Sequence, residues 1–422
     1  MNAPVAIDYK ARAHLDPWSM PLEDIDVSNP YLYQEDTWAG FFARLRRDDP
    51  VHFVNSPMYG PYWSATRYRD IMTVDTSHHI YSSDASMGGI ALRDVPFEFR
   101  RESFIAMDPP KHDAQRKVVS PIVAPLNLAK LASTIRERAG RILDSLPRGE
   151  VFDWVDLVAV ELTTQMLATL FDFPFAERRL LTYWSNVASV NTRAGTEIDT
   201  EQKRDAVLQQ MLSYMTDLWN TRAKEPPQPD LISMLAHAEA TRDLPSRPSE
   251  FMGNMLLLIV GGNDTTRNSI TGGLLALNKF PGEYAKLRAN PALVEKMVPE
   301  IIRYQSPVVH MRRTAMQDTE LGGKQIRKGE KIAMWYISGN RDGEEIEDAD
   351  SFVIDRARPR QHLSFGFGIH RCVGNRLAEM QLTILWEEIL KRFPAIEVVE
   401  EPSRSYSNLI HGFTEMKVRI PA

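Results

Sequence analysis

The stretch FGFGIHRCVG, from Phe365 to Gly374, contains the only cysteine of the chain and decides how the rest of the sequence is interpreted. Cys372 follows a glycine-rich loop and precedes a segment with a helical pattern. Backbone N–H groups and the helix dipole at such a position favour a negatively charged sulfur, so we predict a lowered thiol pKa. Lone cysteines are more often inert buried side chains, but this context favours a functional thiolate.

A single thiolate limits the chemistry that this loop can support. Without neighbouring Cys or His ligands it cannot build a zinc or iron–sulfur site, but it can be the one axial ligand of a haem. A GxGxxG dinucleotide loop fits poorly, because its third glycine position is Arg371 and no βαβ unit surrounds it. A cysteine hydrolase is a weaker alternative: His370 is two residues away, but no third orienting group is evident.

The pattern Phe365-x-x-Gly368-x-x-x-Cys372-x-Gly374 resembles the haem-binding signature of the cytochrome P-450 family. The resemblance extends from about residue 20 to the end and implies one domain over residues 1–422, with the first 20 or so residues flexible. It implies a mainly α fold with a minor β part. Haem b is expected between a long central helix and the cysteine loop, with Cys372 as the iron ligand and Phe365 among the cofactor-binding residues.

Composition agrees with a soluble globular protein. Charged residues make up 25% and hydrophobic residues 43% of 422 residues, and the net charge of −6 does not indicate a nucleic-acid partner. The N-terminus lacks the apolar core of a signal peptide, and the longest aliphatic run, residues 255–260, is far shorter than the roughly 20 residues of a spanning helix. We therefore expect a cytoplasmic protein without a membrane anchor.

Hydrophobic periodicity and turn residues outline the secondary structure. Ser249 is expected to cap the start of a long helix, and Pro281-Gly282 to end it. In chain order, the expected elements are a hairpin of 51–54 and 62–66, mostly helix over 127–223, the long helix over 249–280, a helix over 292–305, short strands and turns over 314–360, a helix from Cys372 to about 393, and short strands over 396–420.

The long helix carries the polar sequence GGNDTT, residues 261–266, in an otherwise apolar segment. Buried polar groups are costly unless they are paired or functional. Thr265 can bond back to the Gly261 carbonyl and open the helix, which leaves a groove for oxygen and water. The resemblance implies that Asp264 and Thr265 deliver protons during O2 activation. The alternative is a packing glycine pair beside a satisfied aspartate.

Glu300 and Arg303 form an i, i+3 pair that means little by itself. The resemblance implies that they join Arg356 in a structural cluster beneath the haem. It also implies cationic partners for the two haem propionates. The residues at these positions are His112, Arg116, Arg313 and His370. Because Arg312 directly precedes Arg313, the sequence leaves open which of these two arginines binds a propionate.

A substrate pocket is expected above the haem. Its candidate lining residues are Met87, Ile90, Leu257, Val260, Gly261, Val308, Val309, Leu409 and Ile410. This set contains no cation to bind a carboxylate, which favours a hydrocarbon or a fatty acid that enters tail first. His310 and His411 would change that expectation if they faced inward.

Within the family, the sequence is most similar to bacterial soluble terminal hydroxylases of alkanes and fatty acids. The implied activity is insertion of one oxygen atom of O2 into a C–H bond, with electrons from a ferredoxin and an NAD(P)H-dependent ferredoxin reductase. The ferredoxin is expected to dock where Arg371 and Arg376 supply positive charge. Hydroxylation of another small apolar substrate such as a terpene, a peroxide-using enzyme and a non-catalytic haem protein remain as alternatives.

Overall fold

The long central helix, α11 (Pro248–Lys279), organises the computed structural model, which describes residues 7–95, 100–189, 191–193 and 195–422. Its 32 residues match the expected span within one residue at each end. The predicted cap is wrong, because Pro248 occupies the first turn and Ser249 instead donates its Oγ–H to the Arg100 carbonyl, at 2.7 Å. The helix ends where Pro281 starts α12 (Pro281–Ala289).

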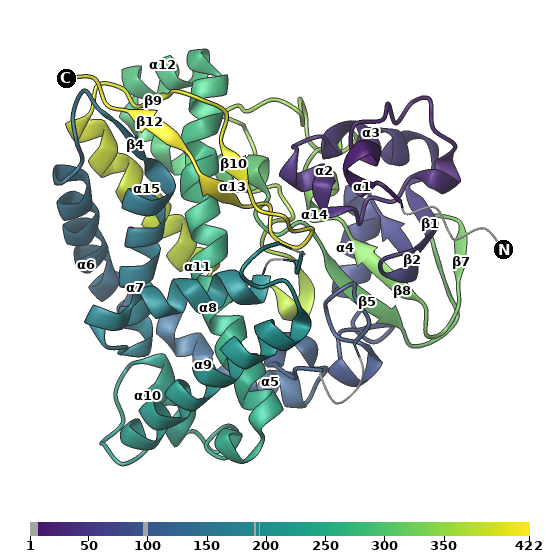
Figure 1. Cartoon of the computed structure of the whole chain (residues 1–422), viewed down its shortest axis with the longest axis horizontal. Coiled ribbons are helices and arrows are strands. Elements are labelled where there is room, and N and C mark those ends of the chain that lie inside the picture. Colours follow the sequence, from purple (N-terminus) through teal and green to yellow (C-terminus); the bar gives the residue numbers. More distant parts are fainter. Residues whose placement is uncertain (1–6, 96–99, 190, 194) are drawn as a thin grey trace.

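A helical lobe surrounds α11 and occupies the left of the molecule in Figure 1. The helices of this lobe share one large apolar core, and α11 is buried in it along most of its length. Its further helices are α5 (Lys111–Val119), α6 (Pro125–Asp144), α7 (Glu161–Phe171), α8 (Arg179–Ser189), α9 (Glu201–Arg222), α10 (Leu231–His237), α13 (Val294–Gln305) and α15 (Asn375–Arg392).

A smaller lobe contains a five-stranded sheet with the order β1-β2-β8-β5-β3, on the right of Figure 1. The strands are β1 (Val51–Ser56), β2 (Gly60–Ala65), β3 (Tyr81–Ser82), β5 (Met311–Ala315) and β8 (Lys331–Met334). The expected hairpin is present as the antiparallel pair β1–β2, while β2 pairs in parallel with β8. Helices α1 (Tyr9–Arg12), α2 (Pro30–Gln34), α3 (Trp38–Asp48), α4 (Tyr68–Thr76) and α14 (Tyr336–Gly339) belong to this lobe.

Short strands complete the structure. They are β4 (Val151–Asp153), β6 (Thr319–Leu321), β7 (Lys324–Ile326), β9 (Glu397–Val398), β10 (Ser403–Arg404), β11 (Phe413–Glu415) and β12 (Lys417–Arg419). The C-terminal tail that holds β9 to β12 crosses between the lobes, where Asn408 Nδ2 donates to the Ser28 carbonyl at 2.8 Å. The fold is mainly α with a minor β part, as expected.

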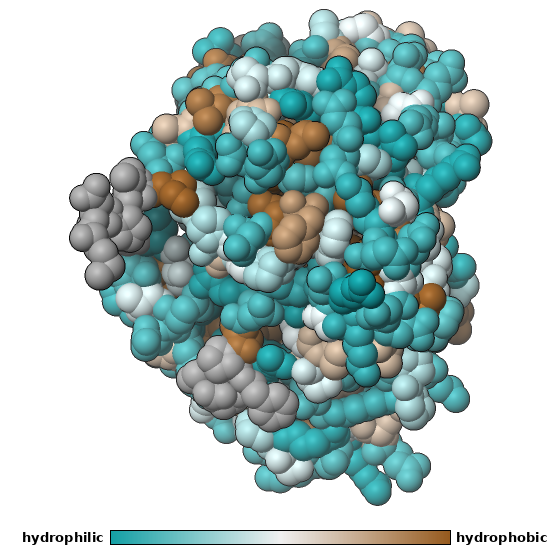
Figure 2. All heavy atoms as spheres, turned by 90° about the vertical axis from the view of Figure 1, so that its right-hand side faces the viewer, coloured by the Kyte–Doolittle hydropathy of each residue, from teal (hydrophilic) through white to brown (hydrophobic). Residues whose placement is uncertain are grey.

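The N-terminal segment that was expected to be flexible is only partly described, because residues 1–6 lie outside the described structure. Residues 7–20 contact the small lobe: Ala13 is buried, and the Tyr9 carbonyl accepts a hydrogen bond from Asn29 at 2.7 Å. On the face seen in Figure 2, hydrophobic residues are scattered among hydrophilic ones.

Within the described residues, no single helix is both long enough and apolar enough to cross a membrane. One bent pair, residues 111–123 with 125–144, reaches the required length and composition when its two helices are taken together.

Candidate active site

The cysteine loop is held against the end of α4. Cys372 N–H donates to the Phe365 carbonyl at 2.8 Å, which closes the loop before α15. Gly366 and Gly368 have φ angles of 63° and 64°, a left-handed conformation that side chains rarely adopt. A Cβ on Gly368 would also lie 2.5 Å from the Asp75 carbonyl oxygen, so both glycines are required for this close approach.

The Cys372 side chain borders open space, but the surrounding protein still desolvates its sulfur. Burial raises the pKa of the thiol, while backbone N–H groups of Gly374 and Asn375 and the charge of Arg116 lower it. The balance is a raised pKa, so the prediction of a lowered value is wrong for the protein alone. Coordination to a metal ion deprotonates a thiol outright, so the thiolate form depends on the bound iron.

Two histidines of the predicted propionate site lie next to each other. The rings of His112 and His370 are 4.5 Å apart between centroids. His112 Nε2 and His370 Nδ1 are both buried, and neither has a partner in the described structure. Buried polar atoms are normally hydrogen-bonded, so two adjacent unpaired nitrogens indicate a polar group that the chain itself does not supply.

The two predicted arginines flank the cysteine loop from opposite elements. Arg116, on α5, donates to the Arg371 carbonyl beside the cysteine. Arg313, on β5, is buried and donates to Asp75 Oδ1 at 2.9 Å. Its neighbour Arg312 points away, into an ion pair with Asp94 at 2.6 Å. The strand alternation therefore favours Arg313, as predicted, for the side that faces the cysteine loop.

One face of α11 borders open space above the cysteine loop. Leu257, Gly261 and Thr265 follow at four-residue intervals and are partly or fully exposed, whereas Ile259, Asn263 and Asp264 on the other side of the helix are buried. A Cβ on Gly261 would meet nothing within 4 Å. Thr265 Oγ1 donates to the Gly261 carbonyl at 2.9 Å, which confirms the predicted back-bond.

Asp264 is completely buried and anchors a polar network to α8. Its Oδ1 accepts from Ser185 Oγ at 2.8 Å and from Asn263 at 3.2 Å, and pairs with Arg267 at 3.0 Å. Arg267 in turn donates to Asn186 at 2.6 Å. Asp264 Oδ2 has no partner in the described structure. Among the described residues, Asp264 is thus held through one oxygen only.

The predicted Glu300, Arg303 and Arg356 cluster is formed and buried. Glu300 pairs with Arg303 at 2.8 Å and with Arg356 at 2.9 Å. Arg303 also donates to the carbonyls of Asn340, Ala349 and Ser351. These contacts join α13 to the segment before the cysteine loop, which supports the structural role.

Three distant segments that carry predicted pocket residues lie next to one another. The Arg312 N–H donates to the Ile90 carbonyl at 2.8 Å, and the Thr314 hydroxyl donates to the Met87 carbonyl at 2.9 Å. Val309 N–H donates to Leu409 at 2.9 Å. The tail also contacts α11, because Phe413 N–H donates to Asn268 at 2.9 Å. The predicted residues Met87, Ile90, Leu257, Val260, Val308 and Leu409 are all partly exposed.

Val309 does not fit this prediction. Its side chain is fully buried in the apolar cluster around Trp335, so it offers no surface to a ligand. Ile410, which was also predicted to line the pocket, is buried as well and does not fit the prediction either. Val308 is partly exposed and forms a β-bridge with Ile410. Alternation along this extended segment explains why only one of the two valines can line a pocket.

The two histidines near the pocket do not add a free cation. His310 packs on Trp335 with ring centroids 4.6 Å apart, and burial lowers its pKa to about 4. Burial also lowers the pKa of His411, whose Nε2 is 3.4 Å from Asp36. Both rings are therefore neutral near pH 7, in agreement with an apolar pocket.

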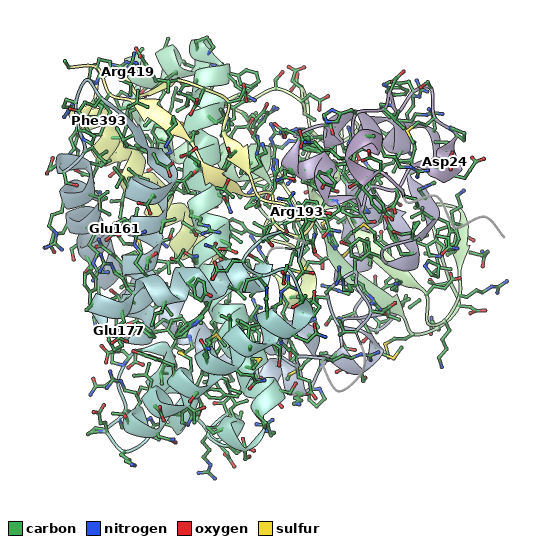
Figure 3. The ribbon with its side chains drawn as sticks, viewed as in Figure 1. Asp24, Glu161, Glu177, Arg193, Phe393 and Arg419 are labelled. Carbon is green, nitrogen blue, oxygen red and sulfur yellow. The ribbon has the colours of Figure 1, made fainter. Side chains whose placement is uncertain are left out.

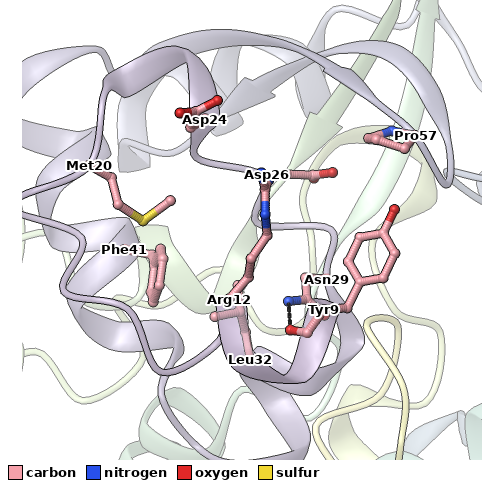
Figure 4. Close-up of a pocket in the computed structure, with 9 residues that line it drawn as sticks. All are labelled: Tyr9, Arg12, Met20, Asp24, Asp26, Asn29, Leu32, Phe41 and Pro57. Carbon is pink, nitrogen blue, oxygen red and sulfur yellow. Dashed lines mark hydrogen bonds between the residues drawn. The ribbon is translucent and has the colours of Figure 1, made fainter. Parts of the chain in front are cut away.

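Two other cavities lie away from this site. A space of about 20 Å³ in the small lobe is shown in Figure 4; its lining residues are Tyr9, Arg12, Met20, Asp24, Asp26, Asn29, Leu32, Phe41 and Pro57. A hollow of about 400 Å³ lies near Arg193, at the junction of the lobes in Figure 3, and is bounded by α2 and β10. Neither cavity is lined by a residue predicted for the active site.

Sequence reasoning missed several residues of the site. Arg267 could have been found, since it follows Asp264 at i+3 on a helix. Asp75 and Ser185 carry no local signal, because only the packing of α4 and α8 brings them to the loop and to Asp264.

The site fits a haem. A single thiol faces open space on one side, and Gly261 and Thr265 border open space at the middle of α11. Two unpaired buried nitrogens and Arg116 lie beside the cysteine loop, where the acidic propionates need donors. When bound, the haem supplies the iron and the redox chemistry that the chain lacks.

Comparison with known proteins identifies relatives over nearly the whole chain. The family model for cytochrome P450 matches residues 160–412. Linalool 8-monooxygenase from Pseudomonas putida is 36% identical over 94% of this chain and 99% of that protein. The methyl-branched lipid omega-hydroxylase from Mycobacterium tuberculosis is 32% identical over 95% and 96%. Among solved structures, CYP153D17 from Sphingomonas sp. PAMC 26605 is 46% identical over 95% and 100%, with a TM-score of 0.89.

Proposed function

Because this chain belongs to the cytochrome P450 family and is a haem b monooxygenase, we propose that it hydroxylates the terminal carbon of medium-chain alkanes or fatty acids. The reaction consumes substrate, O2, two electrons and two protons, and yields an alcohol and water. The observation that carries the O2-dependent assignment is the Asp264–Thr265 pair beside the open space at Gly261.

We assign proton delivery to this pair. Asp264 is held through Oδ1 by Ser185 and Arg267, which leaves Oδ2 free to take up and pass on a proton. Thr265 keeps its Oγ in position through the Gly261 carbonyl, where it borders the open space. A peroxide-using enzyme or a non-catalytic haem binder would not need this arrangement.

The walls of the pocket support an apolar substrate. The exposed lining is aliphatic, and the two nearby histidines are neutral near pH 7. Such a lining binds chains by burial of apolar surface rather than by ion pairing. Terminal C–H bonds are the harder ones to break, so selectivity for the chain end requires a narrow pocket that presents only that end.

The relatives support two substrate classes. One is named as an omega-hydroxylase of methyl-branched lipids, which agrees with oxidation at a chain end. Another is named for oxidation of linalool at position 8, so a terpene is the second candidate. For electron supply we propose a ferredoxin and an NAD(P)H-dependent reductase, with Arg371 and Arg376 as part of the docking surface.

A product assay tests this proposal. Purified holoenzyme is supplied with ferredoxin, reductase and NADH, and is offered octane, dodecanoic acid or linalool in separate reactions. We expect 1-octanol and 12-hydroxydodecanoic acid as the main products. Turnover of linalool alone would refute the terminal hydroxylation of unbranched chains, and retention of full activity by Thr265→Ala would refute the assigned proton path.

A further inference from the structure

We infer that Asp75 is a positioning residue, which holds Arg313 and the cysteine loop in one fixed arrangement around the haem. Asp75 lies at the end of α4, in the small lobe, and none of the sequence motifs includes it. The inference rests on the haem site described above and adds a residue that acts through other residues rather than on the substrate.

Three hydrogen-bond donors converge on this one carboxylate. Arg313 donates to Oδ1 at 2.9 Å, and the backbone N–H of Phe367 donates to Oδ2 at 2.7 Å. Tyr336 donates its hydroxyl to Oδ2 at 3.3 Å. Only an ionised carboxylate accepts from all of them, because an amide has one acceptor oxygen and a second group that is itself a donor.

The surroundings leave Asp75 little freedom. Its side chain is 2% exposed and Arg313 is 3% exposed. The loop rests directly on the end of α4, where a Cβ on Gly366 would approach Asp75 Oδ2 to 3.2 Å. The carboxylate therefore links β5 and the cysteine loop, the two elements whose Arg313 and Cys372 would hold a haem.

An adjacent ion pair provides a matched comparison. Arg312 precedes Arg313 on the same strand and pairs with Asp94 at 2.6 Å, on the opposite face. Asp94 is largely exposed, and its partners are Arg312 and Lys331. Loss of the negative charge at residue 94 or at residue 75 removes the partner of a buried arginine on the same strand, but Asp94 is 57% exposed and only Asp75 contacts the cysteine loop among the described residues.

The position of the Asp75 charge has two consequences. In Asp75→Asn, Arg313 would keep at most a neutral amide oxygen as its partner, which would weaken its hold on a propionate. A buried negative charge near the iron also stabilises the oxidised, more positive state, so its removal favours reduction. Loss of one charge-assisted hydrogen bond corresponds to about tenfold or more in a rate or equilibrium constant.

The experiment compares Asp75→Asn and Asp94→Asn holoenzymes with wild type. Haem release is followed by transfer to excess apomyoglobin, and the midpoint potential by spectroelectrochemistry. We expect Asp75→Asn to release haem about tenfold faster or more, and to have a more positive potential, while Asp94→Asn matches wild type. Equal haem release and equal potential in all three proteins would overturn the inference.

A second variant covers the case in which Asp75→Asn does not fold. Tyr336→Phe removes only the weakest of the three donors, so the carboxylate charge is less compensated and the potential should become more negative. An unchanged potential in this variant would then count against the inference. Failure of wild type to hold haem would instead refute the proposed function, so the two failures can be told apart.

Discussion

Replacement of Glu300 by glutamine tests whether the buried cluster beneath the haem is structural. The side chain is completely buried, and each of its oxygens accepts from both Arg303 and Arg356. Oε1 also accepts from the Val353 N–H at 2.8 Å. Glutamine has nearly the same shape, but it leaves two guanidinium groups near a single acceptor oxygen and without a negative partner.

The expected cost is large because the remaining charges cannot reach water. Removal of one partner from a buried ion pair costs about 3–5 kcal/mol. A chain of 422 residues has an entropy of unfolding of about 0.9 kcal/mol/K, so this cost lowers Tm by about 3–6 °C. The same change in an exposed pair should cost less than about 0.5 kcal/mol, which corresponds to less than about 1 °C.

Thermal unfolding followed by far-ultraviolet circular dichroism measures this difference. Glu137→Gln is the control, since Glu137 pairs with Arg141 on α6 and both side chains are more than half exposed. We expect Glu300→Gln to unfold several degrees below both wild type and Glu137→Gln. If Glu300→Gln and Glu137→Gln unfold within one degree of each other, the buried cluster does not stabilise the fold as we reason.

Three further predictions address catalysis, packing and pH. Thr265→Ala should keep consuming NADH but yield about tenfold less product per NADH. Ser269→Ala removes the same kind of hydrogen bond to a backbone carbonyl one turn later, and its product yield per NADH should match that of wild type. Equal product yields from the two variants would contradict this prediction. Gly261→Ala should raise the free energy of unfolding by up to about 1 kcal/mol, because a Cβ there meets nothing within 4 Å. Gly273→Ala should lower it, because the Cβ would lie 2.7 Å from a side-chain carbon; equal free energies of unfolding for the two variants in a denaturant titration would contradict this. The pKa of His310 in the folded protein is about 4, below its ordinary 6.5, so about 3 kcal/mol of the free energy of unfolding is present above pH 6.5 and is lost as pH falls towards 4. Denaturant titrations at pH 6.5 and pH 4 should show that His310→Phe loses less of its free energy of unfolding than wild type does. An identical loss in both proteins would refute the assignment.

Local patterns in the sequence predicted the parts of this protein that depend on nearby residues. The bounds of α11, the back-bond from Thr265 and the cysteine loop all follow from spacing within one segment. The pairing of Glu300, Arg303 and Arg356 was also predicted, but only through a resemblance, since Arg356 is 56 residues from Glu300.

Features that depend on long-range packing were not predicted. The parallel pairing of β2 with β8 joins residues more than 260 apart, and Asp75 meets Phe367 across 292 residues. The thiol pKa was misjudged for a similar reason: loop geometry favours the anion, but burial by the whole fold outweighs it. Val309 was misassigned because alternation alone does not say which face of a strand is covered.

The crossing of the C-terminal tail between the lobes bears on what a shortened chain would lose. Leu409 and Asn408, which help to form the pocket wall, pair with Val309 and with Ser28, a residue near the other end of the chain. In chain order, these tail residues follow every helix of the described structure. A protein shortened before residue 405 would therefore keep its central helices but lose the contacts that Leu409 makes with Val309 and that Asn408 makes with Ser28.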